Sequence, residues 1–220
     1  IGFIARVRDP AKDIDYPFYV TAHEIAHQWF AHQIIGGDVQ GSTLLSESLS
    51  QYAALKVMEK EFGADQIGKF VRYEMDSYLQ GRSLERKKEL PLLLVENQQY
   101  IHYNKGSLVW YALRDAIGED TLNAVLKRFL QDKGFQQPPY TTSRELLAYL
   151  REERLTDLTP DDARLPKGFV DLSAVQPLTP EEVAALVRAI EQEMTTGPCS
   201  VLILDQDGTR LRLGAAPSLP

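Results

Sequence analysis

The sequence predicts a mainly α-helical fold, followed by a small helix-plus-hairpin extension at the carboxyl end. Two observations lead to this fold class. From residue 17 to residue 154, apolar side chains recur with helical spacing in successive segments, and glycine, proline or a capping residue bounds most of them. After a stretch rich in proline and aspartate, the pattern changes to one more helix and two short strands.

The first two helices are expected on either side of a glycine- and serine-rich loop. Pro17 suits the first turn of a helix, because its missing N–H costs nothing there, and this helix is expected to run to about His32. The second helix is expected over residues 46–62 and ends at Gly63.

A third helix and an irregular segment come next. Asp65 can cap the helix, and Gly81 is expected to end it. Residues 82–99 show no helical periodicity, and they close on the apolar run PLLLV, which is expected to be extended.

Three further helices complete the helical body. One covers residues 104–117 and is closed by Gly118, and the last covers residues 143–153. The helix between them is capped by Asp120, and its apolar residues share one face. These residues are Leu122, Val125, Leu126, Phe129 and Leu130.

Composition excludes several classes of protein. The chain has 220 residues and a net charge of −7, which argues against a nucleic-acid partner, since that partner would require a clustered basic face. No apolar run approaches the roughly 20 residues that a membrane helix needs. Cys199 is the only cysteine, so an internal disulfide and a cysteine-ligated zinc site are both excluded.

The chain divides into three predicted parts. Residues 1–154 form the helical body, residues 155–178 are the linker candidate, and residues 179–220 form the extension. The first residues open within an apparent strand and carry no initiator Met or signal-peptide pattern. We therefore expect a piece of a longer polypeptide, and the localisation stays unknown.

The stretch HEIAH at residues 23–27 is the candidate site. On a helix, His23 and His27 are one turn apart and project from the same face, so their imidazoles can converge on one ion. Glu24 lies beside them, as the proton acceptor of such a motif does. A catalytic zinc site takes three protein ligands, so a third must come from elsewhere in the chain.

Three residues are candidates for the third ligand. His32 is turned roughly half a helical turn away from the pair and is discounted. Asp38 lies in a glycine-rich loop, where nothing holds it in place. Glu47 opens the second helix, and a helical hairpin would fold its first turn back over the first helix. Glu47 is therefore favoured.

Three ordered motifs resemble those of the M1 family of zinc aminopeptidases, within the gluzincin group. HEIAHQWF is followed by LLSESLSQYAAL and later by IHYNKGSLV, and the resemblance covers roughly residues 1–153. It implies that His23, His27 and Glu47 bind zinc and that Glu24 is the general base. It also implies that Tyr103 stabilises the oxyanion. The amino-acid sequence of these motifs is most similar to that of bacterial M1-type domains fused to ABC-transporter permease segments.

The resemblance implies a fold and a mechanism. The fold is the thermolysin-like helical zinc lobe of a metallopeptidase, truncated at its N-terminus. One zinc ion per chain would lower the pKa of its bound water from about 15.7 toward about 7, so that Glu24 can activate it. Zinc and Tyr103 would then stabilise the oxyanion as a peptide or protein substrate is hydrolysed.

The chain also departs from the family pattern. The spacing between His27 and Glu47 is one residue longer than usual, and Ser46-Glu47-Ser48 replaces Asn-Glu-Gly. The G-x-M-E-N motif, which grips the amino terminus of substrates, is absent. Weak hydrolysis by this chain alone is therefore expected, and exo- or endopeptidase action is undecided.

The sequence also leaves open an alternative function for the whole chain and an alternative interpretation of its carboxyl end. The chain could be a catalytically weak or inactive peptidase-like module that binds peptides or supports a membrane transporter. Residues 181–220 weakly resemble the opening of a GAF sensory domain, to which we assign no activity. Trp29 and Phe30, next to the site, are expected to pack in the core.

Overall fold

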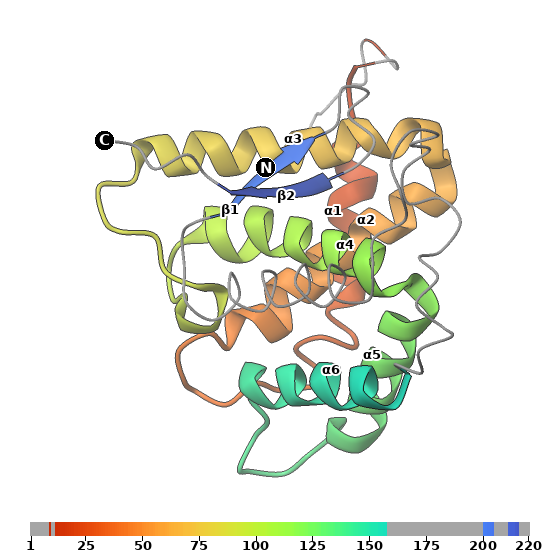
Figure 1. Cartoon of the computed structure of the whole chain (residues 1–220), viewed down its shortest axis with the longest axis vertical. Helices are drawn as coiled ribbons and strands as arrows, with labels where there is room; N and C mark the ends of the chain where they lie inside the picture. The colour runs from red at the N-terminus through yellow and green to blue at the C-terminus, as the bar shows by residue number, and fades with distance from the viewer. Residues whose placement is uncertain (1–8, 10–11, 158–199, 205–210, 216–220) are drawn as a thin grey trace.

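Helices packed through their apolar faces build this protein, as the sequence pattern predicts (Figure 1). The computed structural model describes residues 9, 12–157, 200–204 and 211–215. In chain order, the elements are α1 (Tyr16–Ala26), the π-helical turn η1 (Leu44–Ser48), α2 (Leu49–Phe62), α3 (Ala64–Leu84), the 3₁₀ turn η2 (Leu92–Leu94), the π-helical turn η3 (Tyr100–Lys105), α4 (Gly106–Ile117), α5 (Glu119–Lys133), α6 (Ser143–Asp157), β1 (Ser200–Leu204) and β2 (Leu211–Ala215).

Helix α2 is the centre of the packing. It contacts α1, α3 and α4, whereas α5 packs between α4 and α6. In Figure 1, α3 and α6 consequently lie at opposite ends of the body. The core between these helices holds large side chains with almost no exposed surface, including Trp110, Tyr19, Phe70 and Phe129.

Two glycines end helices where the sequence predicts it. Gly63 follows α2 with φ +86°, and Gly118 follows α4 with φ +88°. Side chains with a Cβ rarely adopt this left-handed region, so glycine is the residue that permits the chain to leave the helix here. Four of the five residues in the apolar stripe predicted for the next helix are likewise buried on α5, and Leu130 is partly buried.

Helix α1 is shorter than predicted, because it ends at Ala26 and not near His32. The backbone turns tightly beyond that point, with Ala31 at φ +131° and a short bridge between Phe30 and Ile34. The main-chain oxygen of His27 accepts hydrogen bonds from the backbone N–H of His32 at 3.1 Å and from its Nδ1 at 2.7 Å. These contacts replace the bonds that a continuing helix would make.

Gly81 does not end the third helix, since α3 continues to Leu84. A Cβ at Gly81 would lie 2.3 Å from the Cβ of Tyr100, so glycine is required here for close packing of η3 on α3. The run PLLLV is also different from the prediction, because Leu92–Leu94 forms a 3₁₀ turn and not an extended segment.

Two helices begin earlier than predicted, and both open as π-helical turns. η1 leads into α2 from Leu44, two residues before the predicted start, and η3 leads into α4 from Tyr100, four residues before it. At each junction a backbone N–H bonds the carbonyl five residues back, from Leu49 to Leu44 and from Gly106 to Ile101.

The predicted hairpin is present near the carboxyl end. β1 and β2 pair antiparallel, with Ser200 opposite Ala215 and Leu204 opposite Leu211. The turn predicted at Asp207-Gly208 and the helix predicted from residue 179 lie outside the described residues. Over the part of the chain that is described, no helix has the length and apolar character needed to span a bilayer.

Candidate metal centre

Helix α1 presents the two histidines side by side. Asp15 caps the helix, since its Oδ1 accepts a hydrogen bond from the backbone N–H of Phe18 at 3.1 Å. His27 is the residue that follows the last helical position, and its backbone is still helical, with φ −59°. The one-turn relation to His23 is therefore kept, and the ring centroids lie 4.6 Å apart.

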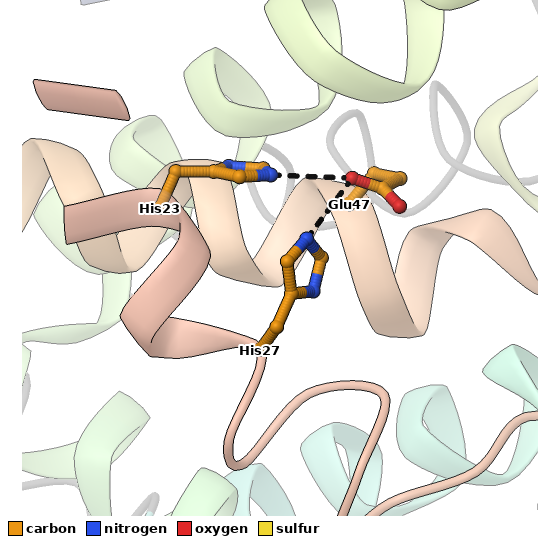
Figure 2. Close-up of side chains that lie close together, drawn as sticks. All are labelled: His23, His27 and Glu47. Atoms are coloured by element: carbon orange, nitrogen blue, oxygen red, sulfur yellow. Dashed lines mark ion pairs between the residues drawn. The ribbon is translucent and has the colours of Figure 1, made fainter. Parts of the chain in front are cut away.

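Glu47 reaches the same point from η1, which leads directly into α2, the helix that packs against α1. Figure 2 shows both imidazoles directed at one carboxylate oxygen of Glu47. Its Oε2 lies 3.3 Å from Nε2 of His23 and 3.5 Å from Nε2 of His27. The structure thus brings together the three residues that the sequence predicts as ligands, and within the described residues they form its one potential metal-ligand cluster.

The spacing of these atoms fits a zinc ion. Two ligand atoms on one tetrahedral zinc, each bound at 2.0–2.1 Å, are about 3.3–3.4 Å apart. The Oε2 of Glu47 is buried and makes no hydrogen bond within the described structure, although two imidazole nitrogens face it. A buried carboxylate oxygen in that position is costly unless a cation shares it.

The hydrogen bonds of His27 support its use as a ligand through Nε2. Its Nδ1 lies 2.9 Å from the main-chain oxygen of Phe30 and 3.1 Å from Oγ of Ser50. A proton on Nδ1 donated to that carbonyl leaves the lone pair of Nε2 directed at Glu47. Ser50 has no motif that marks it in the sequence, but it lies close after Glu47 on the same helical run.

Burial and the neighbouring side chains shift the pKa of the Glu47 carboxyl in opposite directions. Burial alone would raise the pKa of the Glu47 carboxyl, but His23, Tyr103 and His27 together bring it below its ordinary value. Glu47 is therefore an anion at neutral pH, which is the form that binds a divalent cation.

Tyr103 and Glu24 are the two other residues that the sequence predicts for the site. The ring of Tyr103, on η3, is 5.5 Å from the ring of His23. Burial and then the carboxylates of Glu47 and Glu24 raise the pKa of Tyr103, so its hydroxyl stays protonated and can donate a hydrogen bond. Glu24 itself is exposed to solvent on α1.

The structure shows the contacts of Lys105, a residue whose role the sequence alone left open. Its side chain is 2% exposed, and its Nζ lies 2.6 Å from Oε1 of the equally buried Glu89. Arg82 contacts the other carboxylate oxygen of Glu89 at 3.2 Å from a more exposed position. Through Glu89, the lysine thus anchors the turn that carries Tyr103.

Other residues near the motif have different surroundings from those expected. Phe30 is buried, as predicted, but Trp29 is 45% exposed and is not a core residue. It lines a hollow of about 660 Å³ between the loop after α1 and helices α2 and α5. His23, His27 and Glu47 do not line this hollow, so it is separate from the candidate centre.

Comparison with known proteins identifies the family. The model of the peptidase family M1 domain matches residues 7–160, which is more than half of the chain. The chain belongs to peptidase family M1. Among curated proteins, the M1 relative endoplasmic reticulum aminopeptidase 2 of Homo sapiens is 26% identical over 118 residues. That match covers 51% of this chain and 12% of the human protein.

Solved M1 structures share the fold. The M1 zinc metallopeptidase from Deinococcus radiodurans superimposes with a TM-score of 0.53 at 19% identity, covering 82% of this chain and 33% of that chain. A mutant of that enzyme bound to a Tyr-Ser-Ala substrate gives a TM-score of 0.50 at 23% identity, covering 61% and 29%. The chain is thus a mainly α-helical M1 segment that spans a third or less of these relatives.

Proposed function

We propose that this chain carries the zinc-dependent hydrolytic centre of an M1 metallopeptidase that cleaves peptide bonds. His23, His27 and Glu47 would bind one zinc ion per chain, with Glu24 as general base and Tyr103 as hydrogen-bond donor. The observation that supports the proposal best is the position of the Glu47 Oε2 atom, 3.3 Å and 3.5 Å from two imidazole Nε2 atoms.

Zinc, when bound, would make a water molecule acidic enough to react near neutral pH and would polarise the substrate carbonyl. Glu24 takes a proton from the attacking water, and the oxygen of that water adds to the peptide carbonyl carbon. The carbon–nitrogen bond then breaks, and Glu24 passes the proton to the departing amine. The exposed position of Glu24 is consistent with contact to both water and substrate.

Tyr103 would act on the oxygen of the same carbonyl. Negative charge develops on that oxygen as water adds, and a hydroxyl donor that is already in place stabilises it. The raised pKa of Tyr103 keeps the proton on the hydroxyl for this purpose. In comparable sites, losing one such donor costs about 3–4 kcal/mol of transition-state stabilisation.

The finer features of the resemblance stay predictions. They are the likeness to M1-type domains fused to ABC-transporter permeases and the GAF-like character of residues 181–220. The proposed substrate is a peptide or protein, and its side-chain preference stays open.

Metal analysis of the purified 220-residue chain tests the ligand set. The expected result is about one zinc per chain, lost in His23→Ala and kept in Asp38→Ala, which removes an exposed carboxylate from the following loop. Equally low zinc in the unmutated chain and in His23→Ala would refute the proposed centre.

A second experiment separates the base from the ligands. Glu24→Gln should retain zinc and lose peptide hydrolysis, because only the proton acceptor is removed. Glu61→Gln, at an exposed site on α2, is the matched control and should retain both. Zinc without hydrolysis in the unmutated chain would instead favour the peptide-binding alternative.

A further inference from the structure

Glu74 on α3 is a fully buried carboxyl group that the mechanism proposed above does not use. Its side chain has no exposed surface, and its hydrogen bonds come from neutral groups. Three neutral donors point at it. The hydroxyl of Tyr19 and the amide of Gln51 each donate to Oε1 at 2.8 Å, and the amide of Asn104 donates to Oε2 at 2.7 Å.

The three donors come from the three elements that carry the proposed site. Tyr19 is on α1, one turn before His23. Gln51 is on α2, four residues after Glu47. Asn104 is on η3 and directly follows Tyr103. A single acceptor on a fourth helix, α3, therefore connects all of them.

A carboxylate suits this position better than a neutral side chain does. All three partners donate, so the central group must accept on both of its oxygens. A glutamine of the same shape offers one acceptor oxygen, and with Asn104 in its present orientation the two NH₂ groups would face each other. Burial raises the pKa of the Glu74 carboxyl, and the hydrogen bonds from Asn104, Gln51 and Tyr19 oppose this rise by stabilising the ionised form.

We propose that Glu74 is a positioning residue, which sets the relative positions of His23, Glu47 and Tyr103 by holding Tyr19, Gln51 and Asn104. The proposal rests on the proposed zinc function, because it assigns those three residues to the centre. It differs from ordinary core packing in one respect. Changing Glu74 should alter the metal geometry, and not only the stability of the fold.

The test compares Glu74→Gln with an exposed carboxylate on the same helix, changed by Asp76→Asn. Zinc affinity is measured by competition with a chelator, and ligand geometry by the visible absorption bands of the cobalt-substituted chain. Glu74→Gln is expected to weaken zinc binding about 10- to 100-fold, as loss of supporting hydrogen bonds does at other zinc sites, and to shift the cobalt bands. Asp76→Asn should change neither.

A rescue variant makes the test specific. In Glu74→Gln/Asn104→Asp, the acceptor and the donor exchange places across the 2.7 Å contact, while the remaining oxygen of residue 74 still accepts from Tyr19 and Gln51. This double variant should recover most of the affinity and the cobalt spectrum. Failure to recover, when the double variant folds, would overturn the proposal.

Two further outcomes are decisive. If Glu74→Gln lowers only the melting temperature and leaves the affinity and the cobalt bands unchanged, Glu74 serves the fold alone and the inference is wrong. If it does not fold, Tyr19→Phe gives the same decision, because it removes one donor and keeps the ring against Phe70 and Tyr73. Absence of zinc from the unmutated chain would be a failure of the proposed function itself.

Discussion

Replacing Lys105 by methionine should destabilise the fold far more than a surface change does. Methionine keeps most of the aliphatic stem but removes the charge that faces Glu89 at 2.6 Å, where both side chains are almost fully buried. Breaking a buried ion pair costs about 3–5 kcal/mol, since it leaves an unpaired charge in the interior. Because Arg82 and the hydroxyl of Tyr78 still contact Glu89, we expect the lower end, about 3 kcal/mol.

The structure provides a matched comparison on the same carboxylate. Arg82 is 42% exposed, so Arg82→Met should cost no more than about 1 kcal/mol, as exposed ion pairs do. The double variant Lys105→Met/Glu89→Gln removes both buried charges, and it should be more stable than Lys105→Met alone.

Urea and thermal unfolding of the three variants check the ordering. For a chain of this size, 3 kcal/mol corresponds to a fall in melting temperature of roughly 6–12 °C. Equal effects of Lys105→Met and Arg82→Met would refute the reasoning, because burial is the property that separates the two cations.

Three other changes have expected outcomes. Gly106→Ala should weaken zinc binding and lower the free energy of unfolding by about 1–3 kcal/mol, because the new Cβ would lie 2.3 Å from Oγ of Ser48. Adding Ser48→Gly to the same chain should recover part of this loss in urea unfolding. A gain in stability on Gly106→Ala would contradict the prediction. Glu59→Gln should flatten the acid side of the stability profile. Burial raises the pKa of the Glu59 carboxyl, but Lys56 and Arg114 outweigh burial and hold this pKa below its ordinary value. The ionised Glu59 therefore stabilises the fold fully above the ordinary pKa of glutamate, and this stabilisation is lost as the pH falls through the lowered pKa. An unchanged dependence of stability on pH in the acid range would contradict the assignment. Zinc at 100 times its dissociation constant should stabilise the chain by about 2.7 kcal/mol in thermal unfolding, and the same gain in His23→Ala would show binding elsewhere.

Helix ends were predictable where the cause is local. Gly63 and Gly118 have a positive φ, which glycine adopts without a Cβ clash, so the residue type alone marks these helix ends in the sequence. Gly81 was misassigned because its role depends on Tyr100, which is distant in sequence and packs against the missing Cβ. The early end of α1 has a different origin, because short-range contacts within the loop after His27 end this helix and no glycine or proline marks the position in the sequence.

The candidate site shows the same division between local and distant causes. The pair His23 and His27 follows from the helical repeat, and Glu47 follows from the expectation that neighbouring helices fold back on each other. Glu74 gives no such signal, because a glutamate within an amphipathic helix is normally solvated and only the tertiary fold shows that this one is buried. Asn104 could have been suspected from its place beside Tyr103.

The two π-helical turns make the site sensitive to the exact number of residues in the chain. Each turn closes with bonds to the fifth residue back, so it contains one residue more than an α-helical turn. Glu47 and Tyr103 both lie inside such a turn. Deleting one residue within a π-helical turn would let the helix continue as an α-helix. The deletion would also rotate the side chains before the deleted residue by about 100° about the helix axis relative to those after it. Single-residue deletions at these two places should therefore leave the helices intact while aiming Glu47 or Tyr103 away from the histidines.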